Sequence, residues 1–229
     1  MNVRLDLTTV AEALLSVEED WPRIDAELNA LGIGKSPFTE RVRTNMVCAY
    51  GYVDQLLEHD IEPFTDVGME HMLELNHRVH FGLDMDLRAQ YAQAVEANIE
   101  KFNENVEIIA NWYWRHASHG DHALKLAAET YVSILGQPQL FLEGNHRTGA
   151  LIASWINLRA DYPPFVLSAD NAIAYFAPSA EIKQFADRSS WRGRQRLPKY
   201  RRSFRAFWEQ HCQSKYVLPG DRERLVLSN

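Results

Sequence analysis

The sequence has 229 residues, of which 46% are hydrophobic and 24% charged, and its formal net charge is −7. This composition is that of a globular chain large enough for one sizeable core. The negative charge argues against broad binding to nucleic acid. No segment approaches the ~20 consecutive apolar residues that cross a bilayer, so we expect no membrane span.

The start of the sequence and its two cysteines indicate the cellular compartment that we expect for the protein. Residues 1–6 lack the charged-then-apolar pattern of a secretory signal. Cys48 and Cys212 form no metal-spaced pair, so we expect both to pack as small apolar groups rather than as a disulfide. These features predict a cytoplasmic protein, although a secreted effector with a different export signal has the same features.

The spacing of apolar residues predicts helices throughout the first third of the chain. Two short helices are expected within residues 1–33, separated at Trp21-Pro22. A longer helix is expected over residues 36–58, with Ser36 as its N-cap and a proline in its first turn. The next helix is predicted over residues 65–79.

The middle of the chain continues this helical pattern. Apolar positions recur helically over residues 87–115, with a break expected near Asn103. Residues 116–122 are predicted to form a loop, from which Asp121 caps a helix that ends at Gly136. Three histidines in this loop have a spacing compatible with a metal site, but loop histidines are more often solvated, which is the interpretation we favour.

The last third is predicted to hold shorter helices and a basic stretch. Ser168 is expected to cap one short helix, and Pro178-Ser179 to start another. Residues 188–205 are rich in arginine, which we interpret as a solvated face, the alternative being a surface for nucleic acid, phosphate or an acidic partner. Residues from about Pro219 onward have the pattern of a tail. No repeat or linker divides the chain, which predicts one nearly all-helical domain.

The densest group of polar side chains lies at residues 143–147, Glu-Gly-Asn-His-Arg. An apolar segment begins at Ala150, which places this group at the start of a buried helix. The free N–H groups and the positive end of the helix dipole favour an anion there. Arg147 has the geometry to grip a phosphate, and Glu143 can hold a divalent cation that bridges phosphate oxygens.

Residues 139–149 resemble the active-site signature of Fic/Doc (Fido) proteins, His-x-Phe-x-Asp/Glu-Gly/Ala-Asn-x-Arg. Phe141, Glu143, Asn145 and Arg147 stand at the matching positions. The resemblance extends from Asp121 to about Phe185 and implies an all-α Fic/Fido-like bundle, in which a motif loop leads into a buried central helix. The domain division that it implies is a helical extension over 1–35, a Fic/Fido-like domain over 36–215 and a C-terminal tail over 216–229.

The same resemblance implies a ligand and a reaction. Typical members bind ATP with Mg²⁺ and transfer AMP to a hydroxyl group of a target protein (AMPylation), whereas the Doc branch transfers phosphate. Carried over to this sequence, Glu143 ligates magnesium, and the nucleotide or another phosphate-bearing donor is held by the residues that follow, namely Gly144, Asn145, Arg147 and Thr148.

Three positions depart from the signature. Gln139 stands where the family has the histidine that accepts the proton of the target hydroxyl, and an amide does not titrate near neutral pH. His146 replaces a glycine, a position where Doc has lysine. It is a candidate substitute base, but we favour a ring that lines the pocket. Ala150 replaces a second arginine. In addition, residues 87–115 show no hairpin signal for the flap that docks target proteins in the family.

These features leave three functions open. The first is a divergent transferase that keeps a nucleotide-binding site with magnesium. The second is a pseudoenzyme, a binding or regulatory module that has lost the general base with Gln139. The third is a toxin component similar to Doc.

Overall fold

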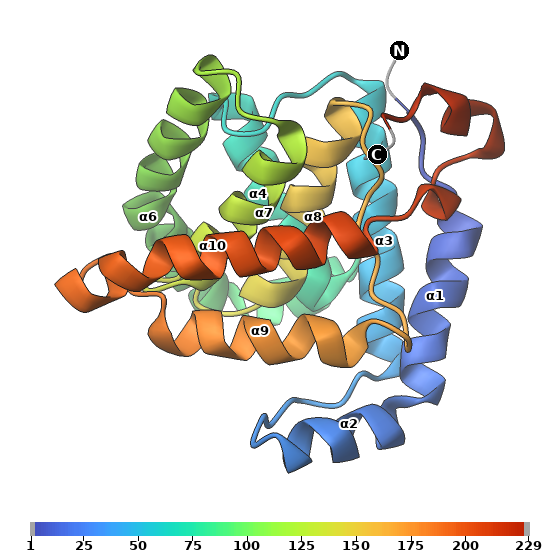
Figure 1. Cartoon of the computed structure of the whole chain (residues 1–229). Helices are drawn as coiled ribbons and strands as arrows, with labels where there is room; N and C mark the ends of the chain where they lie inside the picture. Colours follow the sequence, from blue (N-terminus) through green and yellow to red (C-terminus); the bar gives the residue numbers. More distant parts are fainter. Residues whose placement is uncertain (1–2, 227–229) are drawn as a thin grey trace.

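The computed structural model describes residues 3–226, and these residues form helices joined by short segments (Figure 1). No strand forms among them, and only isolated β-bridges are present, for example between Leu5 and Val217. The helices, in chain order, are α1 (Leu7–Glu19), α2 (Trp21–Ala30), α3 (Glu40–Glu58), α4 (Asp66–Phe81), α5 (Met85–Gln90), α6 (Ala92–Ser118), α7 (Ala123–Leu135), α8 (Asn145–Arg159), α9 (Ala172–Phe185), α10 (Trp191–His211) and the short 3₁₀ helices η1 (Ser214–Tyr216) and η2 (Pro219–Arg224).

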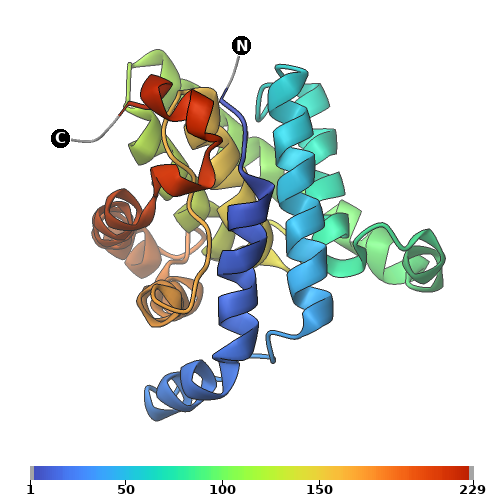
Figure 2. The same ribbon diagram turned by 90° about the vertical axis from the view of Figure 1, so that its right-hand side faces the viewer.

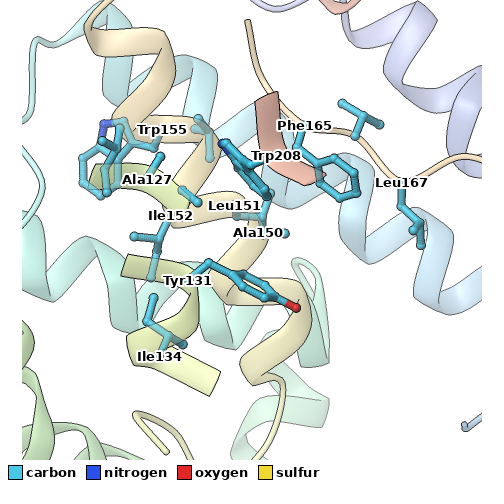
Figure 3. Close-up of a cluster of buried hydrophobic side chains, with 14 of the residues drawn as sticks. Ala127, Tyr131, Ile134, Ala150, Leu151, Ile152, Trp155, Phe165, Leu167 and Trp208 are labelled. Carbon is cyan, nitrogen blue, oxygen red and sulfur yellow. The ribbon is translucent and has the colours of Figure 1, made fainter. Parts of the chain in front are cut away.

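Helix α8 lies at the centre of the bundle, with α3, α4 and α7 packed against it (Figure 1). Twelve of its 15 residues are buried, so it has no solvent-facing stripe. Gly149 brings α7 close, because a Cβ at this position would lie only 3.2 Å from the ring of Tyr131. Around this contact, Trp155 of α8 and Trp208 of α10 are fully buried with Tyr131 (Figure 3).

The N-terminal helices belong to the same hydrophobic core. Helix α1 lies alongside α3 (Figure 2), and α2 packs against α9. The guanidinium of Arg4 donates two hydrogen bonds to the buried carboxylate of Asp54, at 2.9 and 2.6 Å. One cluster of buried side chains runs from Val3 to Leu225, across both predicted domain boundaries. This shared core does not by itself test the predicted division at residue 35, which stays a prediction.

The C-terminal stretch folds back onto the bundle through η1 and η2. Tyr216 and Val217 are fully buried, and the amide of Leu218 donates to the carbonyl of Arg4. The predicted tail over 216–229 is thus folded up to Leu225, while its last three residues, 227–229, lie outside the described residues. The burial of Tyr216, Val217 and Leu225 accounts for the packing of this stretch.

Three predicted N-caps are wrong, those at Ser36, Asp121 and Ser168. Helix α3 starts at Glu40 rather than near Ser36, and the hydroxyl of Thr39 accepts the amide proton of Val42. The segment before it is not helical, because Phe38 is pulled into the core. Asp121 does not cap α7 either. It forms an ion pair with Lys125 at 2.8 Å instead.

Three predicted interruptions also need correction. The break expected near Asn103 lies at Tyr91, between α5 and α6, and α6 continues to Ser118. Residues 116–118 are therefore helical rather than part of a loop. Residues 172–185 form the single helix α9, with Pro178 inside it, and Ser168 lies ahead of that helix without capping it.

In the described chain, the region between α4 and α7, where the resembled family has its docking flap, consists of α5 and α6. Both described cysteines are free thiols, as expected. Over residues 3–226, no helix combines the length and apolarity needed to span a membrane.

Candidate functional site

A cavity of about 210 Å³ lies where α8 begins. Six of the seven site residues predicted from the motif line it, namely Gln139, Glu143, Gly144, Asn145, His146 and Arg147. Its other walls include α1, α2, α3, α9 and the segment between α2 and α3, which contribute Leu14, Trp21, Lys35, Phe38, Met46 and Phe176 among others. The cavity is thus polar at the motif, and its other walls are mostly apolar, with Lys35, Ser36 and Lys183 as polar exceptions.

The backbone of the motif loop is held by its own residues. Gly144 is the N-cap residue of α8 and adopts a left-handed conformation with φ +78°, which favours glycine. A Cβ there would lie 2.6 Å from Nε2 of His80. The side-chain amide of Asn145 accepts from the Phe141 amide at 2.9 Å and donates to the Phe141 carbonyl at 2.7 Å. Asn145 therefore fixes the loop that precedes the helix.

Two buried asparagines outside the motif position the same loop. The amide of Asn76 in α4 donates to the Glu143 carbonyl and to the Thr148 hydroxyl, both at 3.0 Å. Asn98 in α6 donates to Asn76 and accepts from the amide of Leu142, both at 2.9 Å. Thr148 is fully buried and lies behind the cavity wall. Its role is to support the loop.

Sequence reasoning did not identify these two asparagines. The available signal was a polar residue on the apolar face of a predicted helix, since Asn98 lies four residues before the buried Phe102. Buried polar groups of this kind need partners, but the sequence does not say where those partners are.

Arg147 is the cation nearest the start of α8. Its Nη1 donates to the Val79 carbonyl at 3.3 Å. Among the described residues, no carboxylate lies within ion-pair distance of its guanidinium. Burial lowers the pKa of Arg147, an effect that the charge of Glu143 opposes. A partly buried guanidinium with no carboxylate at ion-pair distance is an electrostatically favourable place for a bound anion.

The ring of His146 is engaged at both nitrogens. Nε2 lies 3.2 Å from Nζ of Lys35, and Nδ1 lies 3.2 Å from the hydroxyl of Tyr131. With Lys35 donating to Nε2, the neutral ring carries its proton on Nδ1 and donates to Tyr131. Burial lowers the pKa of His146 well below its usual range, and the neighbouring cations Lys35, Lys183 and Arg147 lower it further. His146 is therefore a neutral, weakly basic ring in the cavity wall.

Lys35 is the site residue that sequence reasoning missed entirely. It lies between α2 and α3, and its ammonium group is 5.0 Å from the centre of the Phe176 ring. Burial, followed by the charge of Lys183, lowers the pKa of Lys35 to about 8. No local pattern marks a single lysine after Gly34, and only the packing of α2 against α9 brings it to the motif.

The basic stretch over residues 188–205 is not wholly a solvated face. The guanidinium of Arg188 donates to the carbonyls of Ser133 and Pro138, and so holds the start of the motif loop. Arg201 forms an ion pair with the buried Glu129 at 3.4 Å. Arg201 faces the bundle because α10 packs against α7, and Arg188, which precedes α10, is held there by its two carbonyl partners.

No family model and no curated protein sequence matches this chain. Among solved structures, a Fic domain-containing signaling protein from Bacteroides thetaiotaomicron matches with a TM-score of 0.55. The alignment covers 95% of this chain and 90% of that one, at 13% sequence identity. This chain has the Fic fold. The match confirms the all-α bundle and the Fic-like fold that the motif resemblance predicted.

At the position where the resembled signature has histidine, this chain has the amide side chain of Gln139. Nε2 of Gln139 donates to the Leu135 carbonyl at 3.2 Å, and the side chain lines the cavity. The amide neither gives nor takes a proton near neutral pH, so it supplies hydrogen bonds to the cavity but no acid–base chemistry.

Magnesium, which the motif resemblance implies, can be compared with the residues that line the cavity. Glu143 is exposed and is the one carboxylate among the described residues that line it. No group of three or more acidic, histidine or cysteine side chains with a metal-binding arrangement occurs in residues 3–226. A Mg²⁺ ion commonly binds through one carboxylate, water and phosphate oxygens. Glu143 therefore suits an ion that arrives with a phosphate.

Proposed function

We propose that the cavity at the start of α8 binds ATP or another phosphate-bearing ligand together with Mg²⁺. The observation that carries this proposal is Arg147, whose partly buried guanidinium lines the cavity and has no carboxylate at ion-pair distance among the described residues. A phosphate beside it would gain charge-assisted hydrogen bonds.

The helix start supports the same ligand. Gly144 offers no side chain to the N–H groups of the first turn of α8, so they remain available to an anion. Glu143 would hold the magnesium ion, which would neutralise phosphate charge. Asn145, Asn76 and Asn98 keep the loop in place before the ligand arrives, which lowers the entropic cost of binding.

Titration calorimetry with Mg-ATP tests the proposal. Arg147→Met should weaken binding by about 10–100-fold, because a hydrogen bond to a charged group contributes about 1.5–3 kcal/mol. Arg159→Met is the matched control, since it removes an arginine from the other end of the same helix, where Asp60 and Glu62 pair with it. If the wild-type protein binds neither nucleotides nor phosphate, the proposal fails.

The second candidate is a binding module without transferase activity, and Gln139 is the observation that favours it. Incubation with a cell lysate and ATP labelled at the α or the γ phosphate distinguishes a transferase from a module that only binds. Transfer of α label indicates AMPylation, and transfer of γ label indicates phosphorylation. A module that only binds should transfer neither, and Gln139→His should then restore α-label transfer if the general base alone is missing.

A further inference from the structure

Two lysines lie at the boundary between the cavity and a neighbouring groove. Lys35 and Lys183 line both the cavity of about 210 Å³ and a groove of about 620 Å³. The groove runs between residues 31–35 and α9. Any ligand that reaches from one space into the other passes these two side chains.

The cations of this region surround His146. The charges of Lys35, Lys183 and Arg147 all act on its ring. Within residues 3–226, neither lysine has a carboxylate at ion-pair distance, and the ammonium of Lys35 contacts only His146 and the face of Phe176. The acidic residues lining the two spaces are Glu143 at the motif and Glu181 in the groove.

The size of the cavity limits what it can enclose. Pockets that bury a drug-sized ligand usually measure about 300–1,000 Å³. A cavity of about 210 Å³ therefore suits one phosphate group and the atoms next to it. The adjoining groove, which shares Lys35 and Lys183 with the cavity, offers room for the rest of a larger ligand.

We propose that Lys35 and Lys183 form a second anion subsite, so that the site selects ligands with two or more linked phosphates. The first phosphate would lie at the start of α8 beside Arg147. The next would lie between the two lysines, and the remainder would occupy the groove along α9. This inference rests on the proposed phosphate-binding function and adds the ligand class: diphosphates and polyphosphates, free or as esters.

The second subsite has a pH dependence of defined sign. The histidine and the charged groups that line the cavity with Lys35 are His146 and Arg147 from α8, Lys183 from α9 and Glu143 from the motif loop. The pKa of Lys35 is lowered to about 8 by burial and by Lys183. A polyanion favours the protonated amine. Binding therefore takes up a proton near pH 8, and the contribution of Lys35 declines at higher pH.

Titration calorimetry of the full chain with inorganic phosphate, pyrophosphate and tripolyphosphate tests this subsite. Wild-type protein should bind pyrophosphate at least about tenfold more tightly than phosphate, the effect of one more charge-assisted contact. Lys35→Met and Lys183→Met should each remove most of this preference while phosphate affinity changes less than about threefold. Lys199→Met, which removes an exposed lysine from α10, should leave the preference unchanged.

The variant Lys35→Arg tests the role of the positive charge at position 35 separately from the deprotonation of the lysine at high pH. An arginine stays protonated, so this variant should keep the pyrophosphate preference up to about pH 9.5, where the wild type loses it. Phosphate binding without a pyrophosphate preference, or a preference that survives in both methionine variants, overturns the second subsite and leaves the Arg147 site standing. Failure of the wild type to bind phosphate, pyrophosphate or nucleotide overturns both proposals.

Discussion

His80 occupies the space that a side chain at Gly144 would need. Its Nε2 would lie 2.6 Å from a Cβ at that position, so the glycine and the histidine fit only as a pair. Burial, followed by the charge of Arg147, lowers the pKa of His80 to about 4. The folded site therefore contains a neutral histidine, and protonating this side chain opposes the folded state.

We predict that this histidine weakens the fold in acid. Its pKa is about 4 in the folded state and 6.5 in an ordinary environment. The unfolded chain therefore binds more protons between these values. Stability from neutral His80 is present above about pH 6.5 and is lost as the pH falls toward 4, by up to about 3 kcal/mol.

Urea unfolding at pH 7 and at pH 4.5 measures this effect. The free energy of unfolding should fall less between the two pH values in His80→Asn than in the wild type. His59→Asn is the control, because His59 is exposed and should leave the pH dependence unchanged. An identical fall in His80→Asn and in the wild type would contradict the assignment.

Among the helices, substitution of two internal glycines by alanine is expected to change the stability of the protein in opposite directions. A Cβ at Gly51 in α3 would make only an ordinary contact of 3.7 Å with Leu7. A Cβ at Gly68 in α4 would lie 2.1 Å from the backbone carbonyl oxygen of Glu62. We predict that Gly51→Ala stabilises the protein by about 0.5–1 kcal/mol, since alanine favours helices.

The same substitution at Gly68 should instead destabilise the protein by about 2 kcal/mol or more, because backbone atoms have to move. Chemical denaturation of both variants measures the two free energies, each variant serving as the control for the other. Equal changes in the free energy of unfolding of the two variants would show that helix propensity, rather than the Glu62 contact, determines the effect at Gly68.

The sequence predicts the helices better than their ends, and the reason is visible at particular residues. Helical spacing of apolar residues located α3, α4 and α7, because that spacing reflects which face is buried. Helix α8, buried on all sides, was predicted instead from the apolar segment that follows the motif. Ser36 and Asp121 had the chemistry of N-caps, but capping also depends on where the chain leaves the core. The burial of Phe38 and the pairing of Asp121 with Lys125 decide this, and both depend on the fold.

The candidate site shows the same division. The motif is contiguous, so its spacing brought Glu143, Asn145 and Arg147 to one cavity as expected. Lys35 and Asn76 come from distant parts of the chain and carry no local signal. Their places depend on how α2 meets α9 and how α4 meets α8.

Across the whole molecule, the N-terminal segment is joined to both the core and the cavity. Arg4 binds Asp54 in α3, and Leu5 forms a bridge with Val217 near the other end of the chain. Trp21 and Lys35 line the same cavity as the motif. The site therefore depends on residues from both sides of the predicted boundary at residue 35.

We predict that α1 and α8 unfold together. Val10 and Leu14 of α1 are fully buried in the core, as are Leu151 and Trp155 of α8. Their slowest amides should exchange with solvent only through global unfolding. Native-state hydrogen exchange should therefore give opening free energies for α1 and α8 that agree within about 1 kcal/mol and depend equally on urea.

Helix α5 is the internal control for this measurement. It has no buried residues, so its amides should exchange at a much lower opening free energy than those of α8. If α1 instead opens several kcal/mol below α8, residues 1–35 are a separate unit, as the motif-based division predicts. In that case the cavity loses Trp21 and Lys35 whenever the extension opens, because both lie within this unit. The exchange experiment thus decides whether the cavity wall is as stable as the helix that bears the motif.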